Sequence, residues 1–157
     1  MEDVEAIIQF AKKLMLEIGS FQPTIFVKGS TRQVAVEIKG FGTHADKRED
    51  MLNAGVWVAT KYNVGELETL IFVSEAWMGM NMNVMPSQDP KRVEVLIINI
   101  LNVATQEERM VQFEIVRNKQ KKVIDLKEPD LPDGYTVKGM LLPAFQKGYQ
   151  IVRPVTN

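Results

Sequence analysis

The fold is decided by the stretch ETLIFVSEAWM, which covers Glu68–Met78. Apolar side chains occur on both of its alternating faces, with Leu70 and Phe72 on one face and Ile71 on the other. A strand that is apolar on both faces is typical of a central strand covered on both sides. Val93–Val103 has the same pattern. The two stretches therefore predict neighbouring antiparallel strands at the centre of a sheet.

The segments on either side of these two stretches predict the other elements. Apolar residues at helical spacing predict two long helices, Asp3–Ile18 and His44–Tyr62. A last short helix, Leu141–Ile151, is expected because a proline such as Pro143 is tolerated in a first turn. Apolar or alternating runs bounded by turn residues predict the remaining strands. These cover Thr24–Lys28, Gln33–Lys39, Arg109–Arg117 and Val123–Leu126.

The order of these elements predicts an α+β fold in a single domain over residues 1–157. Helices do not alternate singly with strands, so a doubly wound parallel sheet is not expected. We predict a mainly antiparallel sheet of five to six strands, two long helices and a short C-terminal helix, in the order α-β-β-α-β-β-β-(β)-α. This order resembles the profilin-like and roadblock-type domains, a resemblance that implies a fold and carries no function.

Composition excludes several classes of protein. The net charge is −1, which disfavours broad nucleic-acid binding. The chain has no cysteine, so disulfides, thiolate metal sites and cysteine nucleophiles are excluded. The acidic start Met-Glu-Asp-Val-Glu is unlike a secretory signal, and the most apolar stretch, Val93–Ala104, is too short and too polar to span a bilayer. We expect a cytoplasmic protein that does not bind membranes.

The most unusual segment is the run SEAWMGMNMNVMPSQDPKRVE, residues 74–94. A connection this long between two strands is uncommon and is often functional. Its methionines, which include Met80 and Met82, either fill gaps over the core or form an adaptable apolar binding surface. Methionine also binds Cu(I), but without neighbouring histidine and cysteine we expect no metal and no cofactor.

A cluster of acidic and aromatic residues is expected where the two central strands meet. If Met78 lies opposite Val93, then Trp77 lies opposite Glu94, and Glu75 projects from the same face. Two carboxylates beside an indole could act as an acid/base pair, or could bind a cationic ligand. A register shift of one residue would separate the side chains onto different faces.

The alternative interpretation of this cluster is structural. Glu75 would then pair with a nearby cation such as Lys91 or Arg92, and Trp77 would be part of the core. If the cluster is functional, Asp89 and Arg92 are further candidates for binding a ligand or partner.

The segments SEAWM and PSQDPKRVEVLI also support a resemblance to a known family. They are similar to the SEAW and PSxDPxRxEVLI segments of a set of uncharacterised bacterial proteins. The resemblance extends from the first helix to the strand that ends near Arg117, and it implies no activity. It implies only a recognisable unit made of Ser74, Glu75, Trp77, Pro86, Asp89, Pro90, Arg92 and Glu94.

Two other segments are weaker candidates. Gly42, Thr43 and His44 precede a predicted helix, so they form either an anion site at free backbone N–H groups or a plain capped turn. His44 is the only histidine, which excludes a site with two histidine ligands. The residues around the turn after Arg109–Arg117 form either a phosphate-binding basic hairpin or a solvated turn. They are Arg117, Lys119, Lys121 and Lys122.

Three functions remain open at this point. The first is a non-catalytic interaction module, either a homodimer or a subunit that binds a protein partner, which is favoured because no catalytic constellation is recognisable. The alternative is a small-molecule binder or enzyme that uses Glu75, Trp77 and Glu94, with a pocket between the long loop and the sheet. The third is nucleic-acid binding through the basic hairpin.

Overall fold

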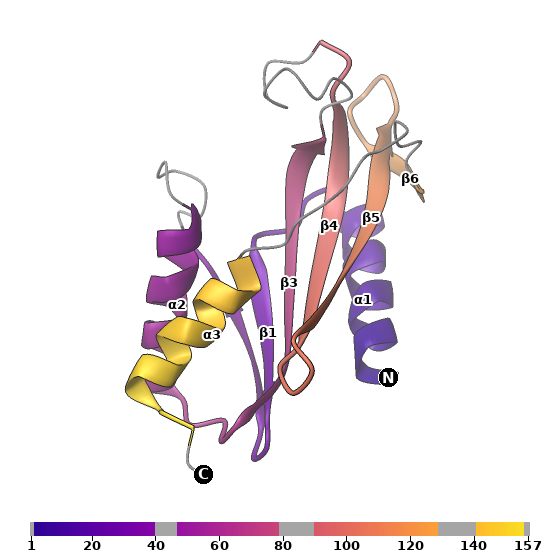
Figure 1. The fold of residues 1–157 in the computed structure, drawn as a ribbon. Helices are drawn as coiled ribbons and strands as arrows, with labels where there is room; N and C mark the ends of the chain where they lie inside the picture. The colour runs from indigo at the N-terminus through magenta and orange to yellow at the C-terminus, as the bar shows by residue number, and fades with distance from the viewer. Residues whose placement is uncertain (1, 40–46, 79–89, 129–140, 156–157) are drawn as a thin grey trace. The chain divides into compact units, whose positions relative to one another are not determined.

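The computed structural model describes residues 2–39, 47–78, 90–128 and 141–155 (Figure 1). The helices in these ranges are α1 (Glu2–Ile18), α2 (Lys47–Lys61) and α3 (Leu141–Val152). The strands are β1 (Thr24–Gly29), β2 (Gln33–Glu37), β3 (Leu67–Met78), β4 (Val93–Asn102), β5 (Glu107–Arg117) and β6 (Val123–Lys127).

The strands form one six-stranded sheet in the order β2-β1-β3-β4-β5-β6. β3 and β4 are neighbours at its centre, which confirms the prediction made from ETLIFVSEAWM. The hairpin pairs β1–β2 and β5–β6 are both antiparallel. The predicted α+β class and element order are thus confirmed. The predicted second strand was too long, because β2 ends at Glu37. The N–H of Ile38 still donates to the carbonyl of Pro23 at 2.8 Å, but proline has no N–H to donate in return.

The contacts of the chain divide it into two compact units. Unit 1 contains residues 1–22, 73–98 and 110–137, and unit 2 contains residues 23–72, 99–109 and 138–157. Each unit draws on three separate segments, and β3, β4 and β5 each contribute residues to both units. One domain over residues 1–157 therefore stays a prediction.

In unit 1, α1 buries one stripe of apolar side chains and contacts β6. The stripe has helical spacing and consists of Val4, Ile8, Ala11 and Met15. Ile18, the last residue of the helix, is 66% exposed. Gly19 follows with a φ of +88° and donates its N–H to the carbonyl of Met15 at 2.8 Å, which is the left-handed ending that glycine favours.

In unit 2, α2 and α3 pack on each other at two buried glycines, Gly55 and Gly148. A Cβ atom on Gly55 would lie 2.1 Å from the carbonyl oxygen of Phe145, and one on Gly148 would lie 2.0 Å from that of Leu52. The two backbones therefore approach closely only because neither glycine has a side chain. The core of this unit also includes Ile25, Val27, Met51, Val58, Ala59, Leu70, Phe72, Leu101, Phe145 and Tyr149.

The turn between β5 and β6 is held by one asparagine. The side-chain oxygen of Asn118 accepts the N–H groups of Gln120 and Lys122, both at 3.0 Å, and Lys121 has a φ of +64°. The strand register shifts between Val116 and Arg117. The extra residue is Ile124 of β6, which lies opposite the step from Val116 to Arg117 in β5.

Tyr149 makes the stability of unit 2 sensitive to alkaline pH. Its hydroxyl donates to the carbonyl of Gly65 at 2.8 Å. Burial raises the pKa of this hydroxyl above the ordinary 10.0, against weaker opposing effects of a backbone hydrogen bond at Val64 and of the charge of Arg153. The folded chain thus keeps the phenol proton at a pH where the unfolded chain has lost it.

We therefore expect the free energy of unfolding to decrease as the pH rises above about 10, because the unfolded state then binds fewer protons than the folded state. Urea denaturation of the wild type and of Tyr149→Phe across this range measures the effect. The variant should start about 1 kcal/mol less stable because it lacks one hydrogen bond. It should then lose less stability with pH than the wild type, and parallel losses would contradict the assignment to Tyr149.

Candidate functional site

The acidic residues expected at the centre of the sheet meet an arginine from β5. In unit 1, Nε and Nη2 of Arg117 donate to the two carboxylate oxygens of Glu94 at 2.8 and 2.7 Å. This bidentate geometry is the strongest form of an arginine–carboxylate pair. The side chains are 27% and 25% exposed, so the pair is partly buried.

The same guanidinium has three further contacts within unit 1. Nη2 donates to the carbonyl of Gly19 at 3.1 Å, and Nη1 donates to the carbonyl of Lys121 at 3.0 Å. Nη2 also lies 3.7 Å from the carboxylate of Glu75. The hydrogen bond with Glu94 raises the pKa of Arg117, burial opposes it, and the charges of Glu94 and Glu75 add to the increase. We call Arg117, Glu94 and Glu75 the arginine clamp.

Glu75 connects the arginine clamp to the segment that follows α1. Its second carboxylate oxygen accepts the backbone N–H of Phe21 at 3.1 Å. Both carboxylates of the predicted acid/base pair are thus occupied by donors of the protein itself. An acid or base in catalysis must exchange a proton with a substrate within hydrogen-bond reach. The observed contacts instead suit a structural role, in which one arginine joins the end of α1 to β3, β4 and the β5–β6 turn.

Trp77 and Arg92 form the exposed part of the same region. The guanidinium of Arg92 lies over the Trp77 ring, 4.6 Å from its centroid, and Trp77 is 47% exposed. The structural interpretation in which Trp77 belongs to the core is therefore wrong. The indole belongs to the second-last residue of β3, and its neighbour Met78 is buried. A guanidinium over an indole face is a cation–π contact, which restrains both side chains on the surface.

The predicted site residues are only partly within the described ranges. Glu75 and Glu94 are brought together by Arg117, and Trp77 lies with Arg92. The cation that pairs with Glu75 is therefore Arg117 of β5. The other candidates lie outside the described residues, and they stay predictions: Met80, Met82, Asp89, Gly42, Thr43 and His44.

The pairing of Arg117 with Glu94 and Glu75 was not predicted, because Arg117 was grouped with the basic hairpin. A usable signal was present, since Phe113, Ile115 and Arg117 alternate along one strand and the first two are buried. An arginine that continues a buried face usually has a carboxylate partner. With Arg117 bound to Glu94, the hairpin keeps only its lysines for contact with phosphates.

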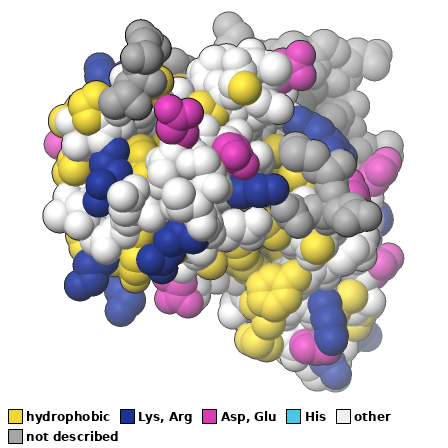
Figure 2. Space-filling model, turned by 90° about the horizontal axis from the view of Figure 1, so that it is seen from below, with side chains coloured by type: hydrophobic (Ala, Val, Ile, Leu, Met, Phe, Trp, Pro, Cys, Tyr) yellow, Lys and Arg dark blue, Asp and Glu magenta, His cyan; other side chains and the backbone are white. Residues whose placement is uncertain are grey.

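Charged side chains are mixed on the face drawn in Figure 2, where basic and acidic groups lie among each other and among apolar ones. A nucleic-acid site requires a basic stripe or patch. The net charge of −1 gives little support to the nucleic-acid hypothesis.

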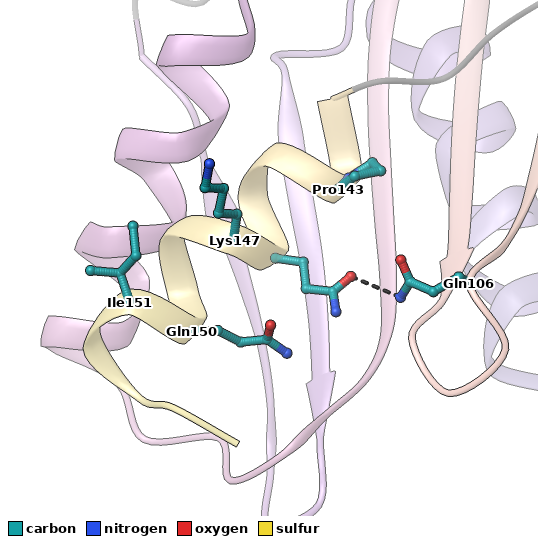
Figure 3. Close-up of a pocket in the computed structure, with 6 residues that line it drawn as sticks. Gln106, Pro143, Lys147, Gln150 and Ile151 are labelled. Carbon is teal, nitrogen blue, oxygen red and sulfur yellow. Dashed lines mark hydrogen bonds between the residues drawn. The ribbon is translucent and has the colours of Figure 1, made fainter. Parts of the chain in front are cut away.

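Unit 2 also has a shallow hollow on α3, with a volume of about 410 Å³ (Figure 3). Gln106 reaches it from the β4–β5 turn, where its φ is +60°, and its side-chain nitrogen donates to Gln146 at 2.9 Å and to the carbonyl of Val103 at 2.8 Å. Lys147 and Gln150 complete its polar lining. Its surface is therefore amide-rich, and its one cation, Lys147, is exposed to water.

Within the described residues, no group of three or more acidic or histidine side chains could hold a metal ion. In the same ranges, no helix has the length and apolar character that crossing a membrane requires. No family model, curated protein or solved structure matches this chain. The resemblance to uncharacterised bacterial proteins and to roadblock-type domains therefore stays a prediction, and the function must be argued from the geometry alone.

Proposed function

We propose that the chain is a non-catalytic interaction module that binds protein through the surface formed by Trp77 and Arg92. The observation that carries this proposal is the half-exposed indole of Trp77 under the guanidinium of Arg92. Tryptophan and arginine are the residues most enriched where binding energy concentrates in protein interfaces. Bacterial origin and a cytoplasmic location are parts of the same proposal, and the chain's lack of cysteine supports the second.

The arginine clamp supports a binding role over a catalytic one. Glu75 and Glu94, the two carboxylates suited to acid/base chemistry, are bound by Arg117 and by the backbone of Phe21. The clamp thereby fixes β3, which carries Trp77, and β4, which begins directly after Arg92. A rigid support of this kind lowers the entropic cost of binding, because the side chains that contact a partner are already ordered.

A homodimer is the first form of this proposal to test, because it needs only the purified chain. Sedimentation equilibrium of the wild type should show monomers and dimers in a concentration-dependent balance. Replacing Trp77 by Ala should raise the dissociation constant at least about 10-fold, which corresponds to a loss of about 1.4 kcal/mol or more.

Trp57→Ala is the matched control, because Trp57 is the other tryptophan, is 49% exposed and lies in unit 2. We expect this variant to associate like the wild type. A wild type that is monomeric at every concentration would contradict the homodimer. Equal weakening by the two substitutions would contradict the assignment of the interface to Trp77.

A further inference from the structure

A second hollow in unit 2 has the features of a binding site that is separate from the Trp77 surface. Its volume is about 640 Å³. Three segments far apart in the sequence line it: the β1–β2 turn, the connection from α2 to β3, and the end of α3 with the residues after it. The lining residues that matter here are Ser30, Gly65, Leu67, Tyr149, Arg153 and Val155.

Arg153 is held in this hollow by one edge of its guanidinium. Its Nε donates to the carbonyl of Ala59 at 2.8 Å, and its backbone N–H donates to the carbonyl of Tyr149 at 2.9 Å. Among the described residues, its two Nη groups have no hydrogen bond or ion pair. A guanidinium that is fixed through Nε and open at both Nη groups is pre-organised to bind a carboxylate end-on through two parallel hydrogen bonds.

The wall of the hollow is rigid around Gly65. This residue has a φ of +82°, and a Cβ atom there would lie 2.1 Å from the hydroxyl oxygen of Ser30. That oxygen accepts the N–H of Glu66 at 3.0 Å, while the hydroxyl of Tyr149 donates to the carbonyl of Gly65 at 2.8 Å. These contacts order the polar wall before any ligand arrives, which reduces the cost of binding.

The lining combines this polar wall with apolar contact area. Leu67 is 8% exposed, and two further apolar lining residues, Val152 and Val155, are exposed. Glu66 is the one acidic residue in the lining, and its side chain is exposed, so water and salt screen its charge. The hollow thus offers a fixed cation and a short apolar wall.

We propose that this hollow binds a small organic monocarboxylate, whose carboxylate contacts Arg153 and whose apolar part lies against Leu67 and Val155. The amide-rich hollow at Gln106 lacks a comparable feature, because its cation, Lys147, is exposed. This site uses none of the residues that carry the proposed interaction surface, so each proposal can fail without the other.

Ligand-observed NMR titration of the full chain with hexanoate tests the proposal, with 1-hexanol as the uncharged probe of the same length. We expect hexanoate to bind saturably and 1-hexanol to bind at least about 10-fold more weakly, because the alcohol cannot pair with a guanidinium. Shifts of the backbone amides of Gly65 and Val152 should locate the site.

Two variants separate the site from general surface binding. Arg153→Met should weaken hexanoate binding at least about 10-fold. Because this change also removes the bond to Ala59, Val155→Asp is the second variant: it replaces an apolar group that the apolar part of the ligand contacts by a carboxylate, and should weaken hexanoate by a similar factor. Arg92→Met, which removes an arginine of unit 1, is the control and should bind like the wild type.

The possible results are distinct. Selective binding of hexanoate that is lost in Val155→Asp and kept in Arg92→Met would support the site. The proposal would be overturned by a wild type that shows no saturable binding, by equal binding of the alcohol and the acid, or by a Val155→Asp variant that binds like the wild type.

Discussion

Replacing Arg117 by Met should lower the free energy of unfolding by about 2–3 kcal/mol, since it leaves partly buried carboxylates without their cation and removes the hydrogen bonds to Glu94. Glu94 and Glu75 are only 25% and 28% exposed, and both depend on this guanidinium. The variant also loses the hydrogen bonds to the carbonyls of Gly19 and Lys121. Methionine keeps much of the side-chain volume, so most of the loss should come from the charge and the hydrogen bonds.

Urea denaturation monitored by circular dichroism measures this loss. Arg92→Met is the matched control, because Arg92 is exposed and stacks on Trp77, and it should cost no more than about 1 kcal/mol. Hydrogen exchange adds a local readout: the amides at the end of α1 should lose protection in Arg117→Met. Equal stability of the two variants would show that the arginine clamp contributes no more than an ordinary surface contact.

The second large effect is expected at the crossing of α2 and α3. Replacing Gly148 by Ala should lower the free energy of unfolding by about 3 kcal/mol, although alanine favours a helix by about 1 kcal/mol over glycine. The added methyl group would lie 2.0 Å from the carbonyl oxygen of Leu52. This atom belongs to a backbone, so the clash is relieved only if the two helices move apart.

Gly55→Ala should have a similar effect, because its Cβ would lie 2.1 Å from the carbonyl oxygen of Phe145. Lys147→Ala is the control for Gly148, because Lys147 is the exposed residue directly before it in α3. Asn53→Ala is the control for Gly55, because Asn53 is an exposed residue close to it in α2. Both controls should stay within about 0.5 kcal/mol of the wild type. Thermal or chemical denaturation of the four variants makes the comparison, and a Gly148→Ala variant as stable as Lys147→Ala would contradict the close crossing.

The elements of the fold were predictable because each is encoded locally. The apolar stripe of α1 is visible in residues three or four positions apart, and the alternation of β5 is visible within one short run. The centre of the sheet was also predictable, since only a strand covered on both faces needs apolar residues at successive positions such as Leu70 and Ile71. Strand boundaries depend on individual hydrogen bonds, and this explains why β2 is shorter than predicted.

The candidate site was predictable only in part, because its key contact is not local. Glu75 and Glu94 could be placed on one face only by assuming that Met78 lies opposite Val93. Their partner, Arg117, is 23 residues beyond Glu94 and lies on another strand, so no local pattern connects the two. The hollow at Arg153 is even harder to predict from the sequence, because it combines a turn, a connection and a helix end that share no sequence pattern.

The placement of the two tryptophans has a consequence for spectroscopy. Trp57 belongs to unit 2 and Trp77 to unit 1, and both indoles are about half exposed. Replacing either one by phenylalanine leaves a single tryptophan, whose selectively excited emission reports on one unit alone. Melting curves of these two single-tryptophan proteins would show whether the units lose their structure in one cooperative transition or in two, which is the operational meaning of one domain.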